Sequence, residues 1–230
     1  MSTSNDPRLE RHQYNSPVAG AAGDAPDSPA PHAVARLLDA RNGLIQTAER
    51  AFLYGLLCAM PQKFIRALEI GTWTGTTMHV LRRACDELYC IDPEPQWIEN
   101  DAIQTRSGNT VRLIKGYSPR DLEKSVPAPY TFVFVDGDHS EAGVYRDTIA
   151  LEPLMERGGV ICFHDANHPP VERGLFAACD QWKRKFNLFH RACDTISETP
   201  DGIFGGISVI TVESDAELDR EPALYLHRGK

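Results

Sequence analysis

Short apolar runs alternate with amphipathic segments along most of the chain, from about residue 65 to about residue 212. The amphipathic segments have the spacing of helices, most clearly TTMHVLRRAC and the stretches at about 140–155 and 171–185. The apolar runs have the length and composition of buried strands and read IRALEI, ELYCI, VRLIK, YTFVFV, GVICF, NLFHRA and GISVITV. Continuous apolar strands separated by helices indicate a parallel sheet covered on both faces. The pattern therefore predicts an α/β, doubly wound, mostly parallel fold.

The N-terminal part of the chain has a different character. Residues 1–31 contain five of the sixteen prolines and few large apolar side chains, so we expect a disordered or mobile tail. The alternative is an arm that becomes ordered over a ligand or a second subunit. Residues 32–60 predict helices, the second of which, TAERAFLYGLLCAM, has Thr47 as its N-cap. We expect a single domain over 32–230, with its core at 65–212.

Charge and composition narrow the range of partners. Acidic residues outnumber Lys and Arg by 32 to 24, which gives a formal net charge of −8. A phosphate backbone requires clustered cations, so we expect no nucleic-acid partner. No apolar stretch reaches the roughly 20 residues that a membrane span requires, so we also expect no membrane partner and a cytoplasmic location.

Polar residues stand where the predicted strands end. In open parallel sheets, ligands bind beyond the carboxyl ends of the strands, so the chemistry of the protein is expected there. The strand ends read Glu69-Ile70-Gly71, Asp92, Gly116-Tyr117, Asp136 and His164-Asp165.

The first strand end carries a glycine-containing turn. Gly71 and Gly75 lie between a strand and a helix, where glycine permits a sharp turn and the close approach of a ligand. The spacing is G-x-x-x-G and not the dinucleotide pattern G-x-G-x-x-G, and the chain has no G-K-S or G-K-T of a P-loop. A nucleoside without phosphates fits this turn better. Asp92, about twenty residues beyond Gly71, is suited to bind both ribose hydroxyls, the alternative being a cap or a solvated turn.

The segments FVFVDGDHS and GVICFHDAN carry the second group of candidates. Each is an apolar strand that runs directly into polar residues, and neighbouring strands lie about 4.8 Å apart, so Asp136 and Asp165 can converge on one cation. Such an ion can hold a substrate hydroxyl and lower its pKa. The alternative is that Asp136 and Asp138 only cap the next helix, for which Ser140 is also available.

Two histidines accompany these carboxylates. His139 follows Asp136 by three residues, and its ordinary pKa of about 6.5 suits a base that accepts a hydroxyl proton. The alternative is an exposed loop histidine. His164 precedes Asp165 directly and is a candidate for a metal ligand, for a support of Asp165 or for a packed residue at the strand end.

At Glu69, the glycine turn and Asp92, the chain resembles the class I S-adenosylmethionine-dependent methyltransferases. The resemblance extends over about 40–212 and implies a Rossmann-like sheet of seven strands, the last of them reversed and here matched by GISVITV. It implies S-adenosylmethionine as cofactor, with Asp92 at the ribose and IKGYSPRDL near the adenine. The cofactor-binding residues that it implies are Glu69, Gly71, Thr72, Gly75, Thr76, Asp92, Tyr117, Ser118 and Asp136.

The second group of residues resembles the metal-dependent bacterial O-methyltransferases that act on sugars and natural products. This resemblance implies that Asp136, His164 and Asp165 bind Mg²⁺ or another divalent cation and that His139 is the catalytic base. The chain departs from that group at His164, where a carboxylate is usual. An imidazole there weakens magnesium binding or favours a metal that accepts nitrogen.

Together these features predict an O-methyltransferase that acts, with metal assistance, on a hydroxyl of a small molecule. We expect the acceptor to bind between the loops at 94–104, 166–172 and 194–204 and the helix that ends before Pro61. The alternatives are a metal-independent N- or O-methyltransferase and a non-catalytic nucleoside-binding module. The tail and the first helix also offer material for a homodimer contact.

Overall fold

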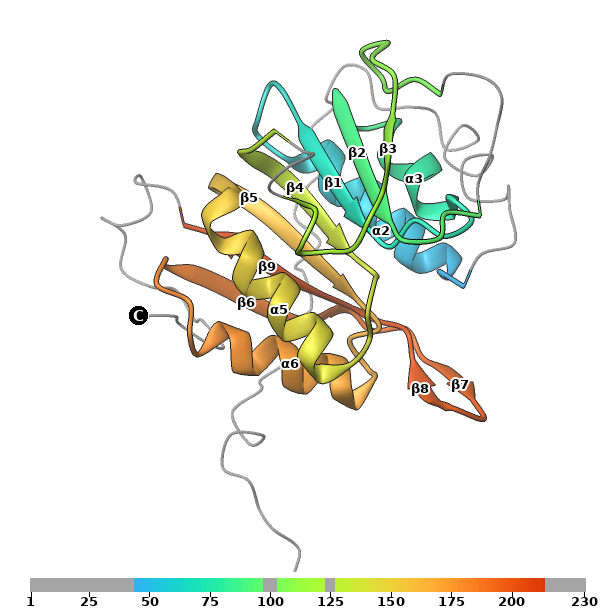
Figure 1. Cartoon of the computed structure of the whole chain (residues 1–230), viewed down its shortest axis with the longest axis vertical. Coiled ribbons are helices and arrows are strands. Elements are labelled where there is room, and N and C mark those ends of the chain that lie inside the picture. The colour runs from blue at the N-terminus through green and yellow to red at the C-terminus, as the bar shows by residue number, and fades with distance from the viewer. Residues whose placement is uncertain (1–43, 97–102, 123–126, 214–230) are drawn as a thin grey trace, which may run out of the picture.

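The computed structural model describes residues 44–96, 103–122 and 127–213 (Figure 1). The predicted tail, the first predicted helix and the stretch around residue 97 lie outside these ranges. No helix in the described part of the chain is long and apolar enough to cross a membrane.

A seven-stranded sheet forms the centre of the molecule, with the order β3-β2-β1-β4-β5-β9-β6. Its neighbouring strands are parallel except at β9, which is antiparallel to both β5 and β6. The strands are β1 (Arg66–Ile70), β2 (Glu87–Asp92), β3 (Arg112–Lys115), β4 (Tyr130–Val135), β5 (Met155–His164), β6 (Phe186–Cys193) and β9 (Ile207–Val212). The doubly wound sheet, with a reversed last strand, confirms the predicted fold class.

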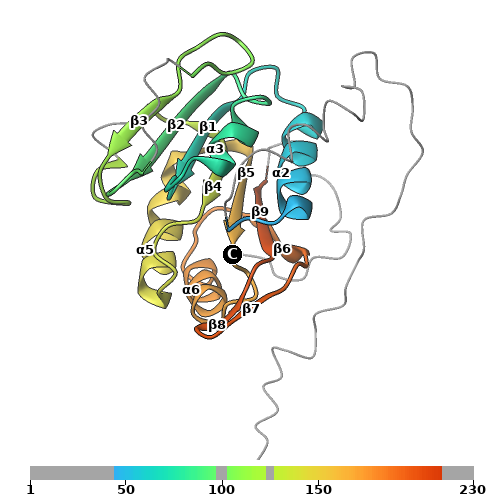
Figure 2. The same ribbon diagram turned by 90° about the vertical axis from the view of Figure 1, so that its right-hand side faces the viewer.

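Helices cover both faces of this sheet, as Figure 2 shows. Along β4, side chains alternate between the faces, as they do in any strand. Phe132 and Phe134 pack with the helices α2 (Thr47–Ala59) and α3 (Thr76–Leu81). Val133 and Val135 pack with α5 (Glu141–Leu151) and α6 (Pro169–Cys179). Burial of β4 on both faces explains its uninterrupted apolar sequence.

Three helix boundaries differ from the prediction. Gln46, and not Thr47, is the N-cap of α2, because its side chain and that of Glu49 form a reciprocal capping box. The helix predicted to reach about residue 155 ends at Leu151, where a short 3-10 turn (Glu152–Leu154) leads into β5. The helix expected at about 171–185 begins at Pro169 and ends at Cys179.

A two-stranded hairpin that the periodicity did not predict joins β6 to β9. It consists of β7 (Ser197–Thr199) and β8 (Gly202–Phe204) and projects from the body of the molecule at one end of the sheet (Figure 1). The hairpin falls within the predicted acceptor loop at 194–204.

Candidate functional site

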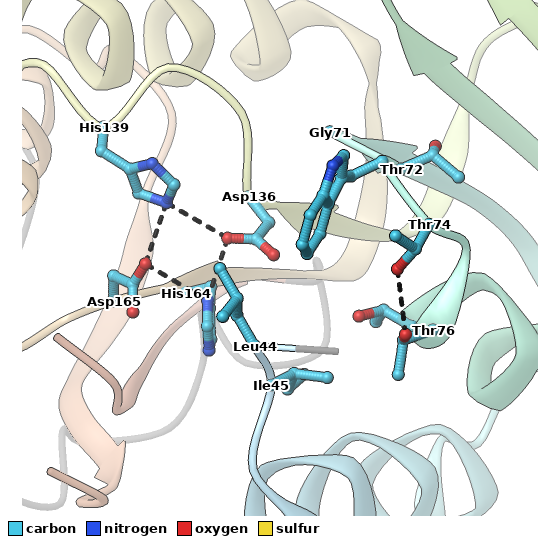
Figure 3. A pocket seen from close by; sticks show the side chains of 12 residues that line it. Leu44, Ile45, Gly71, Thr72, Thr74, Thr76, Asp136, His139, His164 and Asp165 are labelled. Carbon is cyan, nitrogen blue, oxygen red and sulfur yellow. Dashed lines mark hydrogen bonds and ion pairs between the residues drawn. The ribbon is translucent and has the colours of Figure 1, made fainter. Parts of the chain in front are cut away.

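Four side chains converge at the carboxyl ends of β4 and β5 (Figure 3). Nε2 of His139 lies 3.2 Å from Oδ1 of Asp136 and 2.9 Å from Oδ2 of Asp165. Nδ1 of His164 lies 2.9 Å from the same Asp136 oxygen. One potential ligand atom from each of the four residues lies within 4.8 Å of all the others. The structure thus brings together the predicted base and all three predicted metal ligands.

Strand pairing explains this convergence. Val135 of β4 pairs in parallel register with Phe163 of β5, so the next residues, Asp136 and His164, lie side by side at the end of the two strands. Asp165 then turns the chain with a φ of +53°, a left-handed conformation that Asp tolerates better than most residues. Its Oδ1 accepts a hydrogen bond of 2.6 Å from the backbone N–H of Gly205, which orients the carboxylate.

Asp138 and Ser140 perform the capping that was the alternative role for Asp136. The Ser140 hydroxyl accepts a 3.0 Å hydrogen bond from the Gly143 N–H at the start of α5. Asp138 Oδ1 accepts a 2.9 Å bond from the Ser140 N–H. The carboxylate of Asp136 instead faces the two histidines.

The paired charges shift the pKa values in opposite directions. Burial alone would raise the pKa of Asp136 and of Asp165, but the neighbouring imidazoles outweigh it and lower both. Burial alone would likewise lower the pKa of His139, but Asp136 and Asp165 raise it to about 10. The pKa of His164 also rises well above its usual value, because Asp136, Asp165 and Glu49 outweigh its burial. In the absence of a bound cation, the cluster therefore consists of two carboxylates and two imidazolium ions at neutral pH.

Glu49 contacts His164 on the side of its ring opposite Asp136, and the sequence analysis did not predict it as a site residue. Its fully buried carboxylate lies 3.2 Å from Nε2 of His164. Burial tends to raise the pKa of Glu49, but His164, Thr195 and the Gln46 N–H lower it overall. The sequence did contain a signal, because Glu49 precedes the buried Leu53 and Leu57 by four and eight residues and therefore falls on the apolar face of α2.

A cavity of about 190 Å³ connects the cluster to the turn after β1. On one side lie the cluster residues, and on the other the hydroxyls of Thr74 and Thr76 (Figure 3). Its lining residues are Leu44, Ile45, Gly71, Thr72, Trp73, Thr74, Thr76, Thr77, Asp136, His139, His164 and Asp165. Of the predicted cofactor-binding residues, the cavity therefore includes Gly71, Thr72, Thr76 and Asp136.

Gly71 is required by the packing of the chain itself. Its φ is +84°, and a Cβ at this position would collide with the backbone carbonyl of Asp136. The close approach is stabilised by a 2.8 Å hydrogen bond from the Asp136 N–H to the Ile70 carbonyl. Gly75, with a φ of +78°, is the N-cap of α3. Both glycines thus serve the turn, and Gly71 also joins the two halves of the site.

Glu69 and Asp92 do not line the cavity. Oδ2 of Asp92 accepts hydrogen bonds from the N–H groups of Thr72 at 2.9 Å and Trp73 at 2.8 Å, which hold the turn in place. Its Oδ1 accepts a bond of 2.7 Å from the Glu94 N–H. Glu69 is fully buried, and burial raises its pKa to about 8, against the opposing effect of Cys90 and Thr72.

Tyr117 and Ser118 also lie away from the cavity lining. Tyr117 is more than half exposed, and the guanidinium of Arg120 lies 4.9 Å from the centre of its ring. The Ser118 hydroxyl donates a 2.7 Å hydrogen bond to Asp147 of α5. Asp147 is buried, and burial raises its pKa to about 6.

Comparison with known proteins agrees with this architecture. Residues 68–166 match a family model described as a methyltransferase domain, a span that includes the turn after β1 and the four-residue cluster. No curated protein matches the chain by sequence.

Several solved structures share the fold at low sequence identity. One is the O-methyltransferase TomG from Streptomyces achromogenes, involved in tomaymycin synthesis and solved with SAM. It has 17% sequence identity and a TM-score of 0.56, and the match covers 79% of this chain and 90% of the TomG chain. An O-methyltransferase from Bacillus cereus, solved with SAH, has 16% identity and a TM-score of 0.52, covering 79% of this chain and 86% of its own. A third is the mycinamycin-pathway methyltransferase MycE, solved with Mg, SAH and mycinamycin VI. It has 16% sequence identity and a TM-score of 0.52, and the match covers 84% of this chain but only 56% of the MycE chain.

Proposed function

We propose that this chain, which carries a methyltransferase domain and the class I fold of S-adenosylmethionine-dependent methyltransferases, methylates a hydroxyl oxygen of a small molecule with the help of a divalent cation. The observation that carries the proposal is the shared cavity. A turn suited to a nucleoside and a cluster suited to a cation and a base line the same space.

The donor set of the cluster fits a divalent cation. Asp136 and Asp165 supply carboxylate oxygens, and His139 and His164 supply ring nitrogens. Oxygen donors suit Mg²⁺ and Mn²⁺, whereas imidazole suits ions such as Fe²⁺ and Zn²⁺. We propose that Asp136, His164 and Asp165 hold the cation and that its preference lies towards a first-row transition ion over Mg²⁺.

The lining of the cavity fits the methyl donor. Leu44 and Ile45 offer an apolar surface, and the threonines of the turn after β1 offer hydroxyl groups. A mixed lining of this kind is typical of sites for small organic ligands. S-adenosylmethionine supplies a methyl group on a positively charged sulfur, for which the carboxylate of Asp136 provides a complementary charge.

His139 fits the role of base only when its ion pairs are released. With a pKa of about 10, its imidazole already holds a proton at neutral pH and cannot accept a second one. The carboxylates that hold this proton, Asp136 and Asp165, are also two of the proposed ligands of the cation. A cation held by Asp136 and Asp165 would weaken both ion pairs and would lower the pKa of His139, so that its imidazole could accept the proton of the acceptor hydroxyl.

We propose that the acceptor enters from the side of the β7–β8 hairpin. The ring of Phe204 stacks on His168, with centroids 4.4 Å apart and planes at 10°. The next residue, Gly205, donates its N–H to Asp165. The hairpin is thus attached directly to the cluster, and a sugar or natural-product hydroxyl is the acceptor class that we favour.

Metal removal tests this function. The purified protein is treated with a chelator, dialysed and assayed for transfer of labelled methyl groups to a panel of hydroxylated sugars and metabolites. Mg²⁺, Mn²⁺, Co²⁺ and Zn²⁺ are then added back separately. We expect loss of transfer on chelation and recovery with at least one ion. Full turnover in the chelated protein would exclude the metal-assisted mechanism and leave a metal-independent methyltransferase.

A further inference from the structure

Glu49 makes more hydrogen bonds than any structural role of the α2 helix requires. One of its oxygens, Oε2, accepts a bond from the Gln46 N–H at 2.7 Å and lies 3.2 Å from Nε2 of His164. The other, Oε1, accepts a bond from the Gly206 N–H at 2.7 Å and a short one from the Thr195 hydroxyl. Only the capping bond to Gln46 serves the helix itself. The remaining three bonds connect α2 to β5 and to the segment around the hairpin.

The donors around Glu49 define the role of Nε2 of His164. A carboxylate that already receives three hydrogen bonds from N–H and O–H groups is an acceptor, so Nε2 of His164 must be the donor in their contact. Nε2–H is therefore directed away from the cluster and Nδ1 towards Asp136, at 2.9 Å. Histidine ligands in metal sites are commonly oriented by a carboxylate on their second nitrogen.

We propose that Glu49 is a positioning residue, which holds His164 so that its Nδ1 is the ligand atom presented to the cation. This inference rests on the proposed metal-assisted function and deepens it, because it assigns the ligand atom and the residue behind it. His164 and Glu49 are 4% and 0% exposed, so their contact is sheltered from water and its geometry is well defined. The negative charge next to the imidazole also makes Nδ1 a stronger donor to a metal.

A matched pair of variants separates positioning from simple support of the fold. Glu49→Gln keeps the size of the side chain but removes its charge and half of its acceptor capacity. Thr195→Val removes the hydroxyl that bonds to the opposite oxygen of the same carboxylate, and it leaves the contact with His164 in place. If Glu49 only ties the hairpin segment to α2, both variants will affect the site equally.

The first readout is metal affinity, measured by calorimetry with Mn²⁺ and by the visible absorption of bound Co²⁺. We expect Glu49→Gln to raise the metal Kd by about 10- to 100-fold and to change the Co²⁺ spectrum. We expect Thr195→Val to lower the melting temperature but to leave the metal Kd within about threefold of wild type. Equal Kd values for wild type and Glu49→Gln, in proteins that both bind the ion, would overturn the inference.

The second readout identifies the ligand atom directly. Long-range ¹H–¹⁵N spectra of the Zn²⁺-loaded wild-type protein should show His164 with a protonated Nε2 and a metal-bound Nδ1. The opposite assignment, or a free imidazole, would overturn the inference even if methyl transfer requires a metal. Failure of the wild type to bind any tested ion, with methyl transfer intact, would instead reject the metal-assisted function itself and the inference with it.

Discussion

At the ends of β4 and β5, the carboxylates of Asp136 and Asp165 face two imidazoles. At the ends of β1 and β2, by contrast, Asp92 accepts hydrogen bonds from backbone N–H groups and Glu69 is buried beside neutral side chains. The first pair lines the cavity and the second pair does not. All four were predicted as site residues, from their places near strand ends and from the family resemblance. A place near a strand end thus brings an acidic residue close to the site. The residues around its side chain then decide whether the carboxyl group faces the cavity or supports the backbone.

The pKa values of Asp136 and Glu69 differ in the same way. Glu69 is fully buried and Asp136 is partly buried, and burial by itself raises the pKa of either carboxyl group. Histidine neighbours lower the pKa of Asp136 overall, whereas Glu69, beside Cys90 and Thr72, retains a pKa of about 8. Asp136 is therefore ionised at neutral pH, whereas Glu69 is mostly protonated.

Replacement of Asp136 by Asn should have the largest effect. The change removes an anionic partner of both histidines and a proposed metal ligand, so we expect kcat/KM for methyl transfer to fall at least about 100-fold. Asp138→Asn is the matched control, because Asp138 lies two residues away and bonds to the N–H of Ser140. Similar losses in both variants, or activity of Asp136→Asn within threefold of wild type, would contradict the proposed division of roles.

Asp92→Ala tests the supporting role at the other half of the site. The variant loses the hydrogen bonds to the N–H groups of Thr72 and Trp73, and we expect the free energy of unfolding to fall by about 2 to 3 kcal/mol. S-adenosylmethionine affinity should fall as well, because the turn after β1 is no longer held. Denaturant unfolding and calorimetry measure the two effects, with Glu94→Gln as control. A loss of affinity without any loss of stability would instead indicate direct binding of the ribose.

Glu69→Gln should change how stability depends on pH. The folded-state pKa of about 8 lies above the ordinary value of 4.5, so folding favours the protonated form. This stabilisation is complete below pH 4.5 and is lost as the pH rises through 8. Relative to the variant, the wild type should therefore lose stability across this window, by at most about 1.4 kcal/mol per pH unit. Parallel stability curves for the two proteins between pH 5 and 9 would show that Glu69 is ionised throughout.

Ser118→Ala should have the smallest effect. The change removes one hydrogen bond to Asp147, and we expect a loss of about 1 kcal/mol in the free energy of unfolding, with KM for S-adenosylmethionine changed less than twofold. Thermal unfolding and steady-state kinetics measure the two quantities. A tenfold increase in KM without loss of stability would place Ser118 at the cofactor, as the family resemblance implies.

The sequence predicted the frame of this site well. Strand periodicity identified the runs that became β4 and β5, and the polar residues at their ends, Asp136 and His164-Asp165, converge as expected. The prediction succeeded because the end of each strand can be read from its local apolar run. Neighbouring parallel strands then place these ends at the same edge of the sheet.

The roles of other residues at the site had no signal in the neighbouring sequence, or only a weak one. Glu49 lies 115 positions from His164 along the chain, and Thr195 and Gly206 bond to Glu49 from 146 and 157 positions away. The role of Asp92 as a support for the turn after β1 likewise depends on which backbone N–H groups lie within hydrogen-bond distance of its carboxylate.

By itself, the sequence determined the strands, their ends and the polar groups placed there, because periodicity and residue type act over a few neighbouring positions. Only the tertiary structure decided which of those groups share a cavity, which ones support the backbone and which nitrogen of His164 faces Asp136. The physical reason is that a hydrogen bond or an ion pair depends on distances of about 3 Å between atoms, and contacts between distant segments are set by the packing of the whole sheet and its helices.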